Sequence, residues 1–181
     1  MFFLSCGKSE SNSKTDTKQN QNDNSKNNSK GLPFFVFDEV IHYHKSITIE
    51  EWSNIVRKDE KQTKDEKKLL SLLNGYLSEK SLNDKNLIND IESLYPQKKI
   101  INKSKFAILS NIYSEKYHGD YALAACEPYY RDILIFKKQH KIIGISKVCF
   151  ECYLHSTIGS TQNTEQLGQN GDYAKLQDLL K

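Results

Sequence analysis

The stretch Arg131–Phe150, RDILIFKKQHKIIGISKVCF, constrains the fold of this chain more than any other. Two β-branched, apolar runs flank the polar residues Lys138–Lys141. Two such runs separated by a short polar segment predict an antiparallel β-hairpin. We expect Gln139 and His140 to form its two-residue loop, with Lys138 opposite Lys141.

This loop predicts a register for the whole hairpin, because directly opposed residues share a face of the sheet. The expected opposed pairs are Phe136 with Ile143, Leu134 with Ile145, Asp132 with Lys147, Tyr130 with Cys149, and Cys126 with Tyr153. The first two pairs build an apolar face. The pair of Asp132 and Lys147 adds opposite charges across the strands.

The remaining elements precede and follow this hairpin. Residues 34–44, FFVFDEVIHYH, are aromatic and β-branched and predict a strand. Capping boxes at Thr48 and Thr63 predict the starts of two helices, and a third is expected over residues 83–95, before Pro96. Residues 105–118 fit a helix or a strand, and the last ten or so residues predict a short helix capped by Asp172. The expected fold is α+β: an N-terminal strand, about three helices, an antiparallel hairpin region and a short terminal helix.

His42 and His44 are two residues apart in the predicted N-terminal strand, so they share one face. Two histidines at this spacing can bind one metal ion. Because the sequence shows no third ligand nearby, we expect two solvent-facing histidines.

The first six residues predict the compartment. Phe3-Leu4-Ser5-Cys6 resembles the lipobox of a bacterial lipoprotein signal peptide. Residues 1–6 are interpreted as the remnant of that signal peptide, with diacylglycerol on the Cys6 sulfur and a fatty acid such as palmitate on its amino group. Two or more acyl chains give stable anchoring. Gly7 follows the cysteine where aspartate would favour the inner membrane, so we expect an outer-membrane lipoprotein.

Residues 7–31 predict a disordered polar tether, and residues 32–181 a single α+β domain. Residues 8–30 contain only Lys, Ser, Glu, Asn, Thr, Asp and Gln, so they have no apolar side chain whose burial could offset the entropy of ordering. The rest of the chain is nearly neutral, which argues against nucleic acid as a partner. No apolar run is long enough for a transmembrane helix.

Cys126, Cys149 and Cys152 gather at the open end of the predicted hairpin. An oxidising envelope favours a disulfide, and Cys126–Cys152 is the preferred pair, adding about 3–4 kcal/mol by the loop-entropy model. Cys149 and Cys152 would converge only if the chain turns after Phe150, since residues three apart on a strand point to opposite faces. Buried free thiols, a redox pair, and a zinc site remain alternatives. The zinc site would use Cys126, Cys149 and Cys152 with His155 or His118.

The same region carries a motif. Cys126-Glu127-Pro128-Tyr129-Tyr130-Arg131 precedes the predicted strand, and Cys149-Phe150-Glu151-Cys152 ends the hairpin. This arrangement resembles uncharacterised bacterial lipoproteins of the Bacteroidetes type. Many of those proteins have Pro and Arg adjacent, whereas two tyrosines separate them here, so no role for Arg131 follows. The resemblance implies an envelope lipoprotein and implies no activity.

The chain carries no motif of the common hydrolases, metalloproteases or nucleotide-binding enzymes. We therefore expect a non-enzymatic lipoprotein of the cell envelope, without a cofactor. It would bind the membrane through its lipid anchor and present its domain to a protein or other envelope partner. The alternatives are the zinc module described above and an envelope enzyme of another type.

Overall fold

The computed structural model describes residues 31–116 and 126–181, which form an α+β domain around one antiparallel sheet. The elements follow in the order β1 (Glu39–His44), α1 (Ile49–Arg57), α2 (Lys64–Asn74), α3 (Lys85–Leu94), β2 (Gln97–Ile100), α4 (Phe106–Ile112), β3 (Asp132–Lys138), β4 (Lys141–Cys149), β5 (Leu154–Ile158) and α5 (Asp172–Leu180). Short 3-10 helices lie at Asp59–Lys61, Glu79–Asn83 and Lys103–Lys105. The predicted α+β class is confirmed.

The strands lie in the order β2-β1-β3-β4-β5 across the sheet. The predicted N-terminal strand is confirmed as β1, although it begins at Glu39 and not at Phe34, because bends interrupt residues 34–38. The edge strands β2 and β5 are additions that the sequence patterns did not predict. Both are short and largely polar, QKKI and LHSTI, so neither carries an apolar alternation long enough to be recognised.

The helices begin much as their sequences predict. The hydroxyls of Thr48 and Thr63 accept main-chain N–H groups at the starts of α1 and α2, and Glu51 and Glu66 complete the two capping boxes. Residues 106–112 of the ambiguous segment form a helix, α4. The predicted cap of α5 is wrong: Gly171, with a φ of 81°, is the N-cap. No helix in the described part of the chain is long and apolar enough to cross a membrane.

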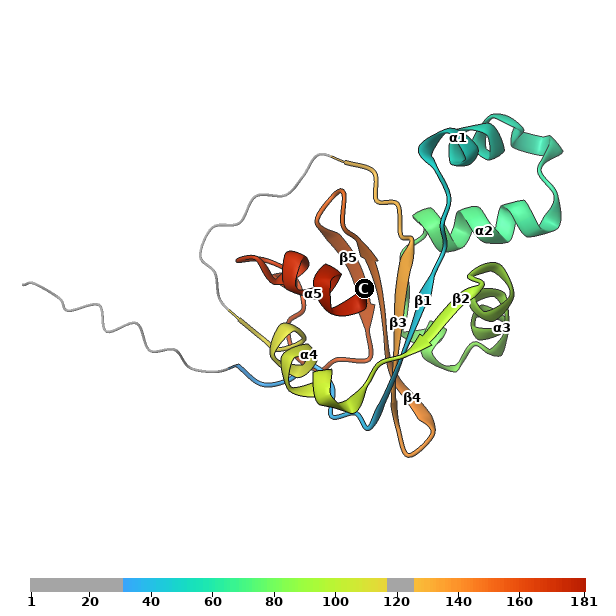
Figure 1. Cartoon of the computed structure of the whole chain (residues 1–181). Helices are drawn as coiled ribbons and strands as arrows, with labels where there is room; N and C mark the ends of the chain where they lie inside the picture. Colours follow the sequence, from blue (N-terminus) through green and yellow to red (C-terminus); the bar gives the residue numbers. More distant parts are fainter. Residues whose placement is uncertain (1–30, 117–125) are drawn as a thin grey trace, which may run out of the picture.

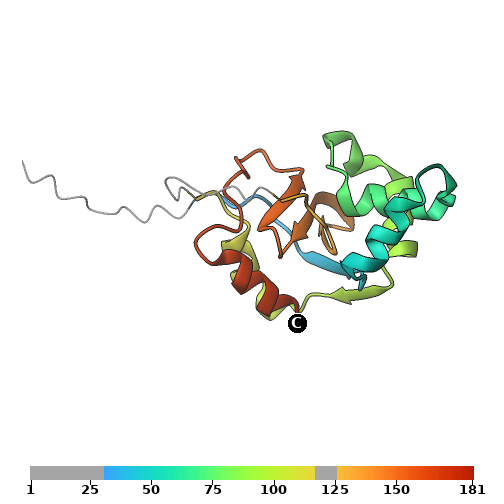
Figure 2. The ribbon, with the colours of Figure 1, turned by 90° about the horizontal axis from the view of Figure 1, so that it is seen from above.

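Helices cover both faces of the sheet, with α1, α2 and α3 on one side and α4 and α5 on the other (Figures 1 and 2). We call these the α1–α3 face and the α4–α5 face. Alternate residues of a strand point to opposite faces. Val40, His42 and His44 of β1 accordingly lie on the α4–α5 face, and Ile41 and Tyr43 on the α1–α3 face.

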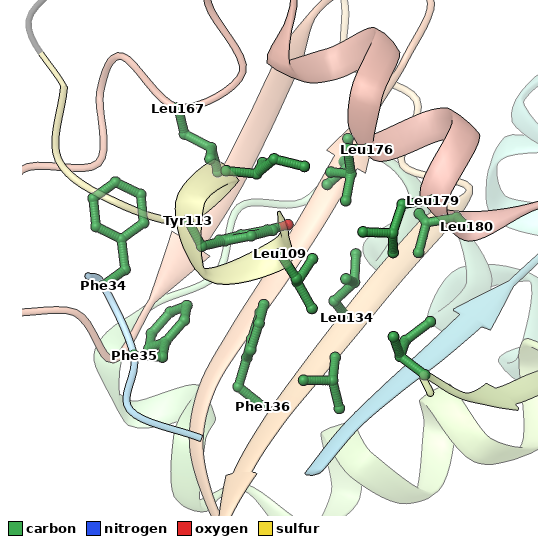
Figure 3. Packing of buried hydrophobic residues seen from close by; sticks show 14 of the residues in the cluster. Phe34, Phe35, Leu109, Tyr113, Leu134, Phe136, Leu167, Leu176, Leu179 and Leu180 are labelled. Carbon is green, nitrogen blue, oxygen red and sulfur yellow. The ribbon is translucent and has the colours of Figure 1, made fainter. Parts of the chain in front are cut away.

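Each face has its own apolar core. On the α4–α5 face, Leu134 and Phe136 of β3 pack under Leu109, Tyr113 and the leucines of α5 (Figure 3). The ring of Phe136 stacks on Phe35 with ring centroids 4.5 Å apart. On the α1–α3 face, the isoleucines of β1, β3 and β4 pack against α2 and α3. Members of this second core include Ile41, Ile133, Ile135, Ile145, Leu73 and Ile91.

The hairpin of β3 and β4 confirms the predicted loop and corrects the predicted register. Lys138 pairs with Lys141, and Gln139 and His140 both have the positive φ angles of a tight two-residue loop. A β-bulge next to Phe136 then shifts the ladder by one residue, so that Phe136 pairs with Gly144.

The bulge has a packing cause. A side chain at Gly144 would collide with the ring of Phe35, because a Cβ built there lies 2.3 Å from the ring atom Cε1. Placing Gly144 opposite Phe136 leaves room for Phe35 to stack on Phe136. The pairings predicted from Phe136 towards the open end of the hairpin are therefore wrong by one residue.

The shift changes the faces of two charged residues. Asp132 pairs with Val148, and Lys147 pairs with Ile133. Asp132 therefore lies on the α4–α5 face and Lys147 on the α1–α3 face. The predicted register had placed the two residues opposite each other on one face.

Candidate metal centre

His42, His44 and Asp132 meet where β1 ends and β3 begins. Asp132 lies directly opposite His44 in the β1–β3 ladder, and His42 is its diagonal neighbour on the same face. The Oδ1 atom of Asp132 lies 2.7 Å from Nε2 of His42 and 2.8 Å from Nδ1 of His44. Both imidazole rings therefore converge on one carboxylate oxygen.

These three side chains can supply ligands to one metal ion. Their ligand atoms all lie within 4.8 Å of one another, and no other trio of His, Cys, Asp or Glu in the described residues does so. Metal–ligand bonds of about 2.0–2.2 Å place neighbouring ligand atoms about 3 Å apart, which small rotations of these side chains can reach. Two imidazole nitrogens and one carboxylate oxygen suit zinc and other divalent transition metals, and they leave coordination positions open.

The trio is half enclosed. His42 and Asp132 are each 7% exposed, whereas the side chain of His44 is 29% exposed. A cavity of about 520 Å³ opens beside them, bounded by the end of β1, the starts of β2 and β3, the turn after β4 and the end of α5. His44 therefore connects the buried pair with the cavity.

Four cationic side chains and one carboxylate line this cavity. They are Lys98, Lys99, Arg131 and Lys181, with Asp132. Lys98 pairs with Glu92, and Lys181 pairs with Asp178. Arg131 forms an ion pair with Glu151, which does not line the cavity, while its own Nε is buried without a hydrogen-bond partner. The structure thus places Arg131 at the edge of the site.

Two lysines hold the end of α5 over this cavity. The Nζ of Lys99 donates to the main-chain oxygen of Lys181 at 3.0 Å, and the Nζ of Lys105 donates to that of Leu179 at 2.6 Å. Figure 2 shows this end of α5 beside β2. Cations at a helix C-terminus are stabilised by the carbonyl groups left unpaired there and by the helix dipole.

The sequence predicted one part of this site. His42 and His44 share a face, as expected, but the expectation that both face solvent is wrong for His42. Asp132 was not recognised as their partner because the expected register placed it beside Lys147. A signal was present, since Asp132 is a carboxylate at the start of a buried strand, but the β1–β3 pairing was needed to bring it to the histidines.

The cysteines form a separate group. The Sγ atoms of Cys126 and Cys152 are bonded to each other, with their Cα atoms 5.8 Å apart, which is the pairing that the sequence analysis favours. The chain turns over residues 150–153, so Cys149 and Cys152 do converge, in one buried cluster with Tyr130. Cys149 is the free thiol of this cluster.

Among the described residues, the cysteines and His155 are not brought together as the ligands of a zinc site. Cys126 and Cys152 bind each other, and His155 lies under the segment before α5, where Nδ1 is 3.1 Å from the hydroxyl of Thr157. Burial lowers the pKa of His155 to about 4. The alternative ligand His118 and the lipidation site Cys6 lie outside the described residues.

Lys147 is a buried ionisable residue on the α1–α3 face, away from the trio. It is 1% exposed, its ammonium donates to the carbonyl of Gly75, and it lies 4.6 Å from the centroid of the Tyr130 ring. Burial lowers the pKa of Lys147 to about 7. The cavity beside the trio does not reach this amine, so we assign it no ligand.

Comparisons with protein-family models, with curated proteins and with solved structures find no match to this chain. The functional interpretation therefore depends on the chemistry of the site.

Proposed function

We propose that this chain is a lipoprotein of the bacterial cell envelope whose domain binds a divalent transition-metal ion through His42, His44 and Asp132. The observation that carries the metal site is the convergence of both imidazoles on Oδ1 of Asp132, at 2.7 and 2.8 Å. The lipobox-like residues 3–6 and the polar residues 8–30 support the anchored location.

The competing interpretation of the trio is a hydrogen-bonded network without a metal. In that case both imidazoles donate an N–H to Asp132, and these hydrogen bonds alone offset the burial of the carboxylate. The half-exposed His44 and the adjoining cavity favour the metal, because an ion needs an entry path and room for further ligands. The ligand set supports binding of an ion, and we assign no reaction to it.

Isothermal titration of the full chain with Zn²⁺ tests the site. We expect one ion per chain. Replacing a direct ligand, in His42→Ala or Asp132→Asn, should weaken Zn²⁺ binding by roughly 100-fold or more, since even outer-shell substitutions cost 10–100-fold.

The matched control for this titration is His140→Asn. His140 is an exposed histidine in the β3–β4 loop, and asparagine tolerates its left-handed backbone, φ 64°. This variant should bind Zn²⁺ like the original chain. Stoichiometric binding that survives both His42→Ala and Asp132→Asn would place the ion elsewhere and overturn the proposed site.

Labelling with radioactive palmitate in a bacterial host tests the anchor. The full chain, expressed behind a complete signal peptide, should take up label, and Cys6→Ala should not. Cys149→Ser provides the control for loss of a cysteine as such. Label retained by Cys6→Ala would refute the lipoprotein assignment without affecting the metal site.

A further inference from the structure

The proposed metal ion would be held by three protein ligands, so part of its coordination shell would be open to the cavity. Sites of this composition complete their coordination with water or with a bound small molecule. The cavity volume of about 520 Å³ lies within the range of about 300–1,000 Å³ that small-molecule sites occupy. The open positions therefore face a space that can hold a ligand.

Lys99 supplies positive charge to the same space. In the β1–β2 ladder it lies directly opposite His42, on the same face of the sheet. Its Nζ donates to main-chain oxygens at the end of α5, at 3.0 Å to Lys181 and 3.5 Å to Leu180. An ammonium has three N–H donors and these two contacts use two of them, so Lys99 retains one donor for a further partner.

The charge of the cavity defines the class of ligand. A divalent ion held by two neutral imidazoles and the single carboxylate of Asp132 would keep a net positive charge, and Lys99 lines the same cavity. The buried Nε of Arg131 is a further donor without a partner at this edge. A neutral or cationic molecule would leave this charge uncompensated, whereas an anion would offset it.

We propose that the metal ion bound by His42, His44 and Asp132 takes a small anionic molecule, with a carboxylate or phosphate group, as its exogenous ligand, and that Lys99 is the second contact of that group. This assignment rests on the metal site proposed above. It names the class of ligand of that site: one anionic oxygen coordinates the ion and another accepts a hydrogen bond from Lys99.

Two neighbouring lysines offer matched controls for Lys99. The ammonium of Lys98 lies over the Tyr43 ring, 5.3 Å from its centroid, and pairs with Glu92 at 3.1 Å, on the α1–α3 face. Lys105 holds the same end of α5 as Lys99 but does not line the cavity. Lys98→Met therefore controls for the lost charge, and Lys105→Met for a loosened helix.

The experiment uses the full chain loaded with Co²⁺, whose visible absorption bands change when its ligands change. Acetate and methylphosphonate are titrated separately, to distinguish a carboxylate ligand from a phosphate-like one. We expect a saturable spectral change with at least one of the two anions. Lys99→Met should weaken that binding about ten-fold, as expected for the loss of one hydrogen bond to a charged group. Lys98→Met and Lys105→Met should leave the affinity within two-fold.

Each other outcome has a defined meaning. If Co²⁺ binds at the trio but neither anion changes its spectrum, the anionic ligand is refuted and the metal site stands. If Lys99→Met and Lys98→Met behave alike, Lys99 is not the second contact, and the proposal fails on that part. If the spectrum of bound Co²⁺ does not depend on His42 and Asp132, the metal site fails and the assignment built on it fails with it. An equal loss in Lys99→Met and Lys105→Met would show that only the position of α5 matters, which also overturns the proposal.

Discussion

The two faces of the sheet bury their ionisable side chains in different ways. On the α4–α5 face, the buried His42 and Asp132 contact each other and adjoin a cavity. On the α1–α3 face, Lys147 is buried with a carbonyl and an aromatic ring as partners, and no ion pair of Lys147 occurs in the described residues. The two environments therefore differ in charge compensation and in access.

This difference distinguishes the trio, which is a candidate binding site, from Lys147, whose burial is unfavourable for stability. Burying a charge is unfavourable unless a partner of opposite charge or a metal compensates it. A metal ion bound by the trio around Asp132 would meet this condition, and the trio adjoins a cavity, so the burial there can serve binding. Lys147 is enclosed, and burial lowers its pKa because the charged form is desolvated. A buried ionisable group is therefore a candidate for function here only when a ligand can reach it.

The largest expected effect tests whether the two faces have separate cores. Phe136→Ala removes a fully buried ring from the α4–α5 face, and Ile133→Ala shortens a fully buried side chain on the α1–α3 face. We expect losses of about 3–5 kcal/mol and about 2–4 kcal/mol in the free energy of unfolding, measured by urea denaturation. Only Phe136→Ala should also weaken metal binding, because it disturbs the face that carries the trio. Equal weakening by both variants would contradict two separate cores.

The disulfide lies at the open end of the hairpin of β3 and β4. It joins the segment before β3 to the turn after β4, with a sequence separation of 26. Replacing Cys126 and Cys152 together by serine should lower the free energy of unfolding by about 3–4 kcal/mol, because the unfolded chain regains the entropy of an open loop. Urea denaturation measures this loss, and intact mass with and without reductant shows the bond directly. A mass unchanged by reductant would contradict the pairing.

Lys147→Met should stabilise the protein, by about 2–4 kcal/mol at pH 6, because it removes the cost of burying an ammonium. Burial lowers the pKa of Lys147 from 10.5 to about 7. Between pH 7 and 10.5, the unfolded chain therefore binds a proton that the folded chain does not, and the contribution of Lys147 to stability rises with pH. The gain from Lys147→Met should thus shrink as the pH rises from 7 to 10. Urea denaturation at these pH values measures it, and a gain independent of pH would show that Lys147 is not desolvated in this way.

Asp132→Asn should have the smallest effect on stability. Asparagine keeps one carbonyl oxygen as an acceptor for the histidines but loses the charge, so we expect a loss of about 1–2 kcal/mol in the absence of metal. Adding Zn²⁺ should raise the melting temperature of the original chain and leave that of Asp132→Asn unchanged, since only a bound ion stabilises the folded state. Equal stabilisation of both proteins would place the ion outside the trio, and stabilisation of neither would identify the trio as a hydrogen-bonded network.

Local rules accounted for the elements that the sequence predicted correctly. The capping boxes at Thr48 and Thr63 depend on residues three positions apart, and the two-residue loop at Gln139 and His140 depends on its immediate neighbours. The shared face of His42 and His44 follows from the alternation of any strand. The edge strands β2 and β5 were missed because their pairing partners, and not their own residues, make them strands.

By itself, the sequence determined the α+β class, the starts of α1 and α2, the hairpin loop and the location of the two histidines on one face. Only the tertiary structure decided which residues oppose one another. Gly144 lies opposite Phe136 because the ring of Phe35, from a distant segment, occupies the space above it, and this one-residue bulge separates Asp132 from Lys147. Asp132 then meets His44, 88 positions earlier in the chain, through the pairing of β1 with β3. The packing of distant segments thus created both the candidate metal site and the buried lysine, because register and face depend on long-range contacts that local sequence does not encode.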